Sequence, residues 1–236
     1  MYLQRNSGII LALDLTDERS AFNLVKAVFE DIDAIKIGYP LILNTGIGVI
    51  RKIKTTFNIP VIADLKIADI PFIAKLITKI AIENLSDGII IHGFMGPDGI
   101  EACIQEAGGK MIFVTTELTN PGGEIFTRLV AEDICRIALE LGAYGIQAPG
   151  TRPERIKRFR EIVGKKLKII ACGIGAQGPK PGTAIKAGAD FEIIGRAIYN
   201  SLHPNKEIKK IKEEIKRAIL GDNFMENPDR NDDKYL

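Results

Sequence analysis

Residues 60–66 read Pro-Val-Ile-Ala-Asp-Leu-Lys, a short apolar run that ends in charged side chains. Its length and its β-branched residues favour a strand, and its nearly unbroken apolar character is typical of a parallel strand covered on both faces. Seven further runs have this form. The eight begin at Gly8, Asp33, Pro60, Asp87, Lys110, Ala143, Leu167 and Asp190. Successive starts lie 23 to 33 residues apart, so one nearly constant period extends along the chain.

Segments with helical periodicity lie between these runs. Examples are residues 18–30, 125–141 and 153–163, and a last predicted helix covers 205–219. Eight strand–helix units predict a (β/α)8 TIM barrel that forms a single domain over residues 1–219. The alternative is an open, doubly wound sheet. It usually has fewer strands, and its GxGxxG motif is missing after the first run.

The composition is that of an ordinary globular protein. Of 236 residues, 46% are hydrophobic and 26% are charged. The 32 Lys and Arg nearly balance the 30 Asp and Glu, so the composition does not indicate nucleic-acid binding. Cys103, Cys135 and Cys172 are far apart and lack CxxC spacing, which favours reduced thiols and a cytoplasmic location.

Two further expectations concern the ends of the chain and the membrane. The apolar run at residues 8–13 is too short for a signal peptide, and no run is long enough to span a membrane. Residues 220–236 are polar and rich in Asp and Asn, and we expect them to form a flexible C-terminal tail. A capping or interface segment is the alternative for this tail.

Charged residues at the predicted strand ends are the first candidates for a site, because barrel active sites lie at the carboxyl ends of the strands. The first strand is predicted to end at Asp14 and the second at Lys36, and the third contains Asp64 and Lys66. Side chains alternate along a strand, so Asp64 and Lys66 point to one side while Leu65 points toward the helices. We therefore expect four groups of alternating sign to converge at the barrel mouth.

Such an array suits the breaking of a bond between carbon and a carboxylate without a cofactor. An ammonium group held between carboxylates keeps its proton, so it can stabilise a carbanion and then protonate it. A carboxylate about 4 Å from a substrate carboxylate would repel it by about 4 kcal/mol at an effective dielectric of about 20. Because ground-state strain is contested, we rank it below electrostatic stabilisation of the transition state.

The loops after the last two strands predict a phosphate site. Residues 173–178 read Gly-Ile-Gly-Ala-Gln-Gly, and Gly195-Arg196 follows the eighth strand. Glycines let backbone N–H groups approach an anion, and an arginine adds a charged fork. The substrate is therefore expected to be a small phosphorylated anion.

The segment Asp64-Leu65-Lys66-Ile67-Ala68-Asp69-Ile70-Pro71 resembles the DxKxxD signature of the orotidine 5′-phosphate decarboxylase family, in its archaeal type. The resemblance continues, in the family's order, through GIILALD, AIKIGYPLIL, IIIHGF, TELTNPGGEIF, APGTRPERI, GIGAQG and IIGRAIY, from about residue 8 to residue 218. It implies conversion of orotidine 5′-phosphate to uridine 5′-phosphate (UMP) and CO2, the last step of UMP synthesis, with neither metal nor organic cofactor.

The resemblance also implies catalytic roles for individual residues. Lys66 would protonate the carbanion at C6 of the pyrimidine, and Asp64 would lie against the departing carboxylate. Lys36 and Asp14 would contact the ribose hydroxyls and extend the charge array. Asp69 would reach into the neighbouring site of a homodimer.

Further residues would bind substrate. Thr119 would hydrogen-bond the pyrimidine edge, and Ile70 and Cys172 would lie beside the substrate. Gln177, Gly195 and Arg196 would hold the phosphate. Close relatives have Ser where this chain has Thr119 and proline where it has Cys172. The family also often has a threonine near the ribose where this chain has Phe72-Ile73-Ala74, so this chain lacks that hydroxyl.

Two other functions remain open on the sequence. One is a sugar-phosphate decarboxylase or aldolase of the same superfamily that uses Mg²⁺, and the other is a barrel that binds nucleotide without turnover. His92 follows the fourth strand, but we interpret it as a hydrogen-bonded residue beside the site rather than a catalytic base. His203 is expected at the surface. Neither histidine has a Cys or a second His at the spacing that a metal site requires.

Overall fold

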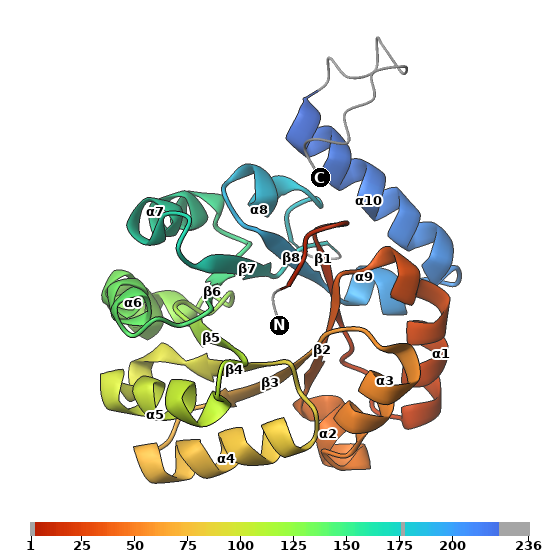
Figure 1. The fold of residues 1–236 in the computed structure, drawn as a ribbon. Helices are drawn as coiled ribbons and strands as arrows, with labels where there is room; N and C mark the ends of the chain where they lie inside the picture. The colour runs from red at the N-terminus through yellow and green to blue at the C-terminus, as the bar shows by residue number, and fades with distance from the viewer. Residues whose placement is uncertain (1–2, 176–177, 222–236) are drawn as a thin grey trace.

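In the computed structural model, which describes residues 3–175 and 178–221, eight parallel strands form a closed barrel in chain order (Figure 1). The strands are β1 (Ile9–Ala12), β2 (Ala34–Gly38), β3 (Val61–Ile67), β4 (Gly88–His92), β5 (Met111–Thr115), β6 (Gly145–Pro149), β7 (Lys168–Cys172) and β8 (Phe191–Ile194). Each begins within two residues of its predicted start, and β8 pairs with β1 to close the ring. The predicted (β/α)8 barrel is confirmed.

Helices surround the ring on its outside (Figure 1). They are α1 (Glu18–Val28), α2 (Tyr39–Thr45), α3 (Val49–Phe57), α4 (Pro71–Glu83), α5 (Pro97–Ala107), α6 (Gly123–Glu140), α7 (Pro153–Val163), α8 (Thr183–Lys186), α9 (Arg196–Tyr199) and α10 (Pro204–Leu220), with 3-10 turns η1 (Phe29–Asp31) and η2 (Gly93–Met95). The predicted helix 153–163 has the observed bounds. The one predicted over 18–30 ends as an α-helix at Val28, and its last residues form η1.

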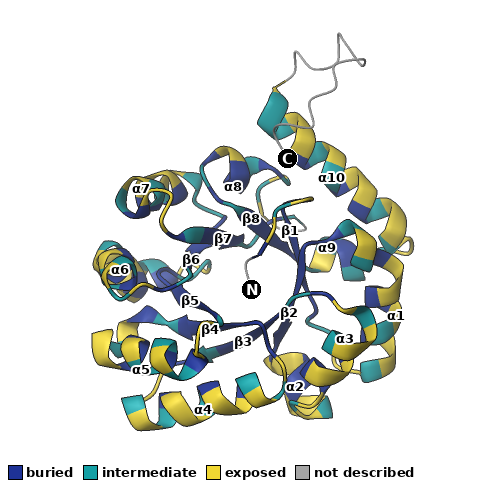
Figure 2. Ribbon diagram, in the orientation of Figure 1, coloured by how far each residue is buried: buried dark blue, intermediate teal, exposed yellow. Residues whose placement is uncertain are grey.

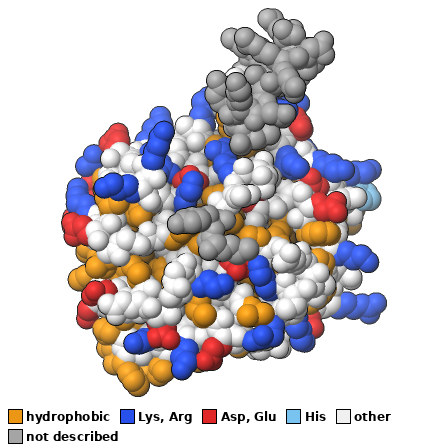
Figure 3. Space-filling view, viewed as in Figure 1, with side chains coloured by type: hydrophobic (Ala, Val, Ile, Leu, Met, Phe, Trp, Pro, Cys, Tyr) orange, Lys and Arg blue, Asp and Glu red, His pale blue; other side chains and the backbone are white. Residues whose placement is uncertain are grey.

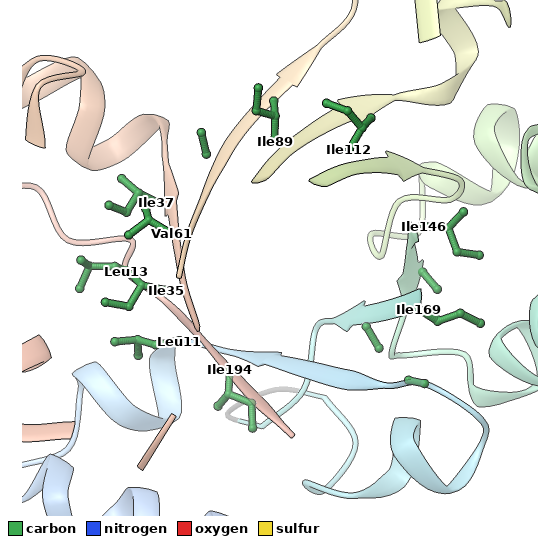
Figure 4. Packing of buried hydrophobic residues seen from close by; sticks show 14 of the residues in the cluster. Leu11, Leu13, Ile35, Ile37, Val61, Ile89, Ile112, Ile146, Ile169 and Ile194 are labelled. Carbon is green, nitrogen blue, oxygen red and sulfur yellow. The ribbon is translucent and has the colours of Figure 1, made fainter. Parts of the chain in front are cut away.

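The alternation of side chains gives the barrel two cores. Outward-pointing residues pack against the helices, as Figure 4 shows for Leu11, Ile35, Val61, Ile89, Ile112, Ile146, Ile169 and Ile194. Inward-pointing residues fill the barrel itself, among them Ile10, Ile62, Ile90, Phe113, Ile170 and Phe191. The strands are therefore buried on both faces, whereas the outer surfaces of the helices are exposed (Figure 2). This explains why the strand sequences are apolar throughout.

Three aspartates fix the amino-terminal end of the barrel. Asp33, Asp87 and Asp190 each immediately precede a strand and are largely buried or half-buried. Asp87 accepts a hydrogen bond from the backbone N–H of Val61 (3.1 Å), and Asp190 accepts one from that of Ile169 (2.8 Å). Each carboxylate thus holds the start of the preceding strand, which has no ladder partner for that donor.

Asp33→Ala should destabilise the fold by about 3 kcal/mol, because Asp33 accepts from the backbone N–H groups of Asn6, Ser7 and Gly8 at 2.7 to 3.2 Å. Urea unfolding measures the loss. Asp33→Asn keeps one acceptor oxygen and should lose less. Equal losses for the two variants would contradict the importance of these hydrogen bonds.

The remaining fold expectations concern the C-terminus and the membrane. The helix predicted over 205–219 is α10, and the barrel ends with it at Leu220. The tail predicted over residues 220–236 lies, from residue 222 onward, outside the described residues. Within the described ranges, no helix combines the length and the hydropathy that crossing a membrane requires.

Candidate active site

A cavity of about 290 Å³ lies at the carboxyl ends of the strands. It is lined by residues from β1, β2, β3, β6, β7, β8 and α9 and from the loops after β1, β5, β7 and β8. They include Asp14, Lys36, Asp64, Lys66, Glu117, Thr119, Gln147, Cys172, Gly173, Gly195, Arg196 and Tyr199. The structure therefore brings together most of the residues that the sequence indicated.

Four charged side chains form a continuous chain of alternating sign in this cavity. The Nζ atom of Lys36 lies 3.4 Å from Oδ1 of Asp14 and 2.8 Å from Oδ2 of Asp64. The Nζ atom of Lys66 lies 2.5 Å from Oδ1 of the same Asp64. Asp64 thus accepts from one ammonium group on each oxygen, and the predicted convergence of the four groups is confirmed.

Burial and pairing act against each other on these groups. Burial by itself would raise the pKa of Asp64, but Lys36 and Lys66 outweigh it and hold the pKa of the carboxyl below its usual value. Burial would likewise lower the pKa of Lys36, but Asp64 and Asp14 raise it above its usual value. Both groups therefore stay charged at neutral pH although their side chains are less than 10% exposed.

The backbone at Lys66 departs from a regular strand. Its φ angle of 44° is in the left-handed region, and the register between β3 and β4 shifts between Asp64 and Ile67. A non-glycine residue in that region costs about 1 kcal/mol or more, and such strain concentrates at functional sites. Leu65 packs among the helices, as predicted. Lys66 therefore contacts Asp64 from an irregular part of β3, while Leu65 stays in the core.

Two predicted strand ends need correction. β1 ends at Ala12, so Asp14 lies in the loop two residues beyond it, and Lys36 is the middle residue of β2 rather than its last. Pairing does continue past β1, because the backbone N–H of Leu13 donates to the carbonyl of Lys36 (2.9 Å). Asp14 therefore contacts Lys36 from the loop after β1, whereas the side chain of Lys36 extends from a position inside the barrel.

His92, at the end of β4, differs from the prediction that it is hydrogen-bonded. Its Nδ1 atom is buried and has no hydrogen-bond partner among the described residues, and its ring packs against Phe94 with centroids 4.5 Å apart. Burial and, to a smaller extent, the charge of Lys66 lower the pKa of His92 from 6.5 to about 4, against the opposing effect of Asp64. At neutral pH His92 is therefore an uncharged ring.

This shift predicts a pH-dependent stability. Between the unfolded pKa of 6.5 and the folded pKa of about 4, the unfolded chain binds a proton at His92 that the folded chain does not. Stability is therefore lost as pH falls through that window, by about 2 kcal/mol after allowance for the partial exposure of the ring. Urea unfolding at neutral pH and near pH 4.5 should show this extra loss in the wild-type protein but not in His92→Gln. Parallel pH profiles of the two proteins would contradict it.

The turn after β7 and the start of α9 form the other end of the cavity. Gly173 has a φ of 85°, and an added Cβ at Gly178 would lie 1.8 Å from the carbonyl oxygen of Gly173. The turn is therefore closed tightly enough to require glycine. Gly195 and Arg196 line the cavity where β8 meets α9. Gln177, predicted to hold phosphate, lies outside the described residues.

Thr119 lines the cavity from the loop after β5, and an ion-pair network holds this loop. Glu117 is 1% exposed and accepts from Nε of Arg152 (2.7 Å) and Nε of Arg155 (2.8 Å). Arg152 also donates to the carbonyls of Leu118 and Thr119. The TRPER segment therefore positions the Thr119 loop from the start of α7.

Three polar residues of the lining were not predicted from the sequence: Glu117, Gln147 and Tyr199. Gln147 interrupts an apolar strand and points into the barrel, where its Oε1 accepts from the Thr115 hydroxyl (2.8 Å). The signal in the sequence that could have identified Gln147 was a single polar residue at an inward-facing position of an apolar strand. Cys172 does line the cavity, 3.6 Å from the carbonyl of Ala148, and burial raises the pKa of its thiol. It is therefore a neutral group at the cavity wall.

Asp69 and Ile70 do not line the cavity of their own chain, judged over the described residues. Both are exposed, and Oδ1 of Asp69 accepts from the backbone N–H of Ile70 (2.7 Å) at the start of α4. Nor does the described part of the chain contain a group of three His, Cys, Asp or Glu side chains that is arranged to hold a metal ion.

A (β/α)8 barrel with charged side chains at the carboxyl ends of its strands, and with glycines and an arginine after the last two, belongs to the class of barrel enzymes. Within that class, the family model described as "Orotidine 5′-phosphate decarboxylase / HUMPS family" matches residues 7–211. The chain belongs to this family.

Individual relatives and solved structures agree. Orotidine 5′-phosphate decarboxylase of Methanosarcina acetivorans is 47% identical over 222 residues, which cover 93% of this chain and 100% of that protein. The Pyrococcus furiosus protein of the same name is 43% identical, over 88% of this chain and 97% of its own. The Methanocaldococcus jannaschii decarboxylase, solved with the inhibitor BMP, has a TM-score of 0.83 at 41% identity and covers 88% of this chain and 97% of its own.

Proposed function

We propose that the chain removes the carboxylate of orotidine 5′-phosphate and gives UMP and CO2, in the last step of UMP synthesis. The observation that carries this proposal is the continuous chain of charges from Asp14 through Lys36 and Asp64 to Lys66 inside the cavity of a barrel of this family. The bond between C6 and the carboxylate breaks, and its electron pair stays on C6. The charged side chains then stabilise that carbanion, and Lys66 protonates it.

Lys66 is the acid in this mechanism. Its ammonium group faces Asp64 and is the more exposed of the two lysines, with 25% of its side chain accessible against 8% for Lys36. It stabilises the developing negative charge at C6 and transfers its proton there once CO2 leaves, and solvent then reprotonates it. Asp64 lies against the substrate carboxylate, and its repulsion from that group ends with the departure of CO2.

The rest of the cavity binds the nucleotide. Lys36 and Asp14 contact the ribose hydroxyls, and Thr119 bonds the edge of the pyrimidine. Gly195 and Arg196, at the opposite end, hold the phosphate, and the resemblance adds Gln177 to them. The hydroxyl of Thr119 keeps the donor of the serine it replaces, and Cys172 offers a neutral wall of a size suited to the flat base.

We further propose a homodimer in which Asp69 reaches the partner's cavity and Ile70 lies beside it. The support is an exposed apolar surface around the start of α4, which continues onto α6 and appears at the lower left in Figure 3. Its members are Ile70, Phe72, Leu76, Ile80, Phe94, Ile125, Phe126, Leu129 and Val130, all more than 40% exposed. Exposed apolar surface of this extent is typical of a protein interface, and a second copy would cover it while bringing Asp69 across.

The function is tested by the loss of orotidine 5′-phosphate absorbance in the presence and absence of EDTA. Turnover that survives EDTA favours the decarboxylase, whereas turnover that requires Mg²⁺ would favour the sugar-phosphate enzymes that share this fold. Nucleotide binding without turnover would favour a non-catalytic barrel. The three free cysteines and the metabolic role favour a cytoplasmic location.

A further inference from the structure

A second cavity, of about 520 Å³, opens at the amino-terminal end of the barrel. It lies where β5, β6 and β7 begin, and Lys110, Lys165, Lys166 and Lys168 line it; we call it the lysine cleft. The catalytic cavity contains Gln147 from the middle of β6 and Cys172 from the opposite end of β7, and the two cavities share no described residue. The lysine cleft is therefore separate from the proposed mechanism.

The lysine cleft carries an excess of positive charge. Among the described residues that line it, none is acidic. Two of its lysines have only shared carboxylate partners. Lys110 pairs with Asp87 at 3.4 Å, but Asp87 also pairs with Lys54 at 2.8 Å. Lys168 pairs with Asp190 at 2.9 Å, but Asp190 also pairs with Arg160 at 2.5 Å. The positive charge of the cleft would therefore attract an anion.

The base of the lysine cleft is apolar. Ile104 and Ile112 form part of its wall together with Tyr144. Gly109 and Gly142 lie at its edge, and an added Cβ at either glycine would meet no atom within 4 Å, so the entrance is open there. A cavity of this volume holds a small organic molecule, and a mixed lining suits one that has both a charged and an apolar part.

We propose that the lysine cleft binds an oligophosphate, a ligand with two or more linked phosphates such as a nucleoside triphosphate. Four ammonium groups on two segments of the chain exceed what one phosphate can contact, whereas a linked chain of phosphates reaches several at once. Lys165 and Lys166 are exposed in the turn before β7 and are available for such a ligand. The apolar wall would receive a base or sugar.

Calorimetry with inorganic tripolyphosphate and with adenosine 5′-triphosphate tests this proposal. Both titrations are run with excess UMP and also in the Arg196→Ala variant, so that the predicted phosphate contact of the catalytic cavity does not contribute. We expect binding of both probes that weakens about tenfold or more in Lys165→Glu/Lys166→Glu and at high salt, because the contacts are between charges. Decarboxylase activity of that variant should be unchanged, since neither lysine lies in the catalytic cavity.

A matched control is Lys206→Glu/Lys209→Glu, which makes the same change of net charge at exposed positions of α10. It should leave both affinities unchanged. Tighter binding of the nucleotide than of tripolyphosphate would identify a nucleoside polyphosphate as the ligand, and equal binding an inorganic polyphosphate. Absence of binding, equal weakening in the control variant, or binding of nucleic acid duplexes alone would overturn the proposal.

Discussion

Lys66→Ala will fold like the wild-type protein and lose about five orders of magnitude in turnover of orotidine 5′-phosphate. Lys66 is the proposed proton donor, and general acid catalysis contributes about 10² to 10⁴ in rate. It is also the charge nearest the proposed carbanion, and one electrostatic contact of this kind contributes about 10² to 10³ more. A single substitution removes both effects.

The fold should tolerate this change for two reasons. Alanine bears a Cβ as lysine does, so the strained backbone at φ 44° is no worse in the variant. Asp64 also keeps Lys36 at 2.8 Å, so no buried carboxylate is left without a partner. Binding of UMP, followed by calorimetry, should therefore remain measurable although turnover is lost.

Lys54→Ala is the matched control for Lys66→Ala. Lys54 also pairs with a buried aspartate, Asp87 at 2.8 Å, but at the opposite end of the barrel. Its loss should lower stability, whereas the activity of the folded enzyme should remain. Retention of most of the wild-type rate by Lys66→Ala would refute the role proposed for Lys66, and a loss of rate in both variants would point to a general effect on the fold.

The fold was predictable because all eight strand–helix units of the barrel have the same structural requirement. Each strand must be buried on both faces, so an unbroken apolar run recurs with each unit. The inward position of Lys36 and Asp64 followed from alternation along parallel strands, because that rule fixes which side chains share the inside of the barrel. Asp14 lies in the loop after β1 and Lys66 in the irregular end of β3, so alternation alone did not fix their positions. The distances among them required the structure.

Other parts of the site depend on contacts between distant segments, which no local pattern records. The burial of Glu117 between Arg152 and Arg155 joins segments some 35 residues apart along the chain. The register shift next to Lys66 arises from pairing between β3 and β4. That Nδ1 of His92 has no hydrogen-bond partner in the part of the chain that the structure describes is likewise a property of its packed surroundings. Sequence periodicity identifies which residues face inward, but not which of them form hydrogen bonds or ion pairs.

Mixing inactive Lys66→Ala with inactive Asp69→Ala should restore about a quarter of the wild-type activity. Asp69 is exposed, lies outside its own cavity as far as the structure describes it, and adjoins the apolar surface proposed for the second copy. If each site takes Lys66 from one subunit and Asp69 from the other, half of the randomly exchanged dimers are mixed, and each mixed dimer has one intact site of two. Activity is measured after subunit exchange has been demonstrated with differently tagged chains.

The reverse mixture makes the test sharper. Wild-type chains mixed with the double variant Lys66→Ala/Asp69→Ala place one defect in each site of every mixed dimer. Shared sites then leave about a quarter of the activity of an all-wild-type sample, whereas sites contained in one subunit leave about half. An Asp69 that acts within its own chain would thus give no recovery in the first mixture and the higher value in the second. Full activity of Asp69→Ala alone would remove Asp69 from the mechanism, and the exposed surface on α4 and α6 would then need another explanation.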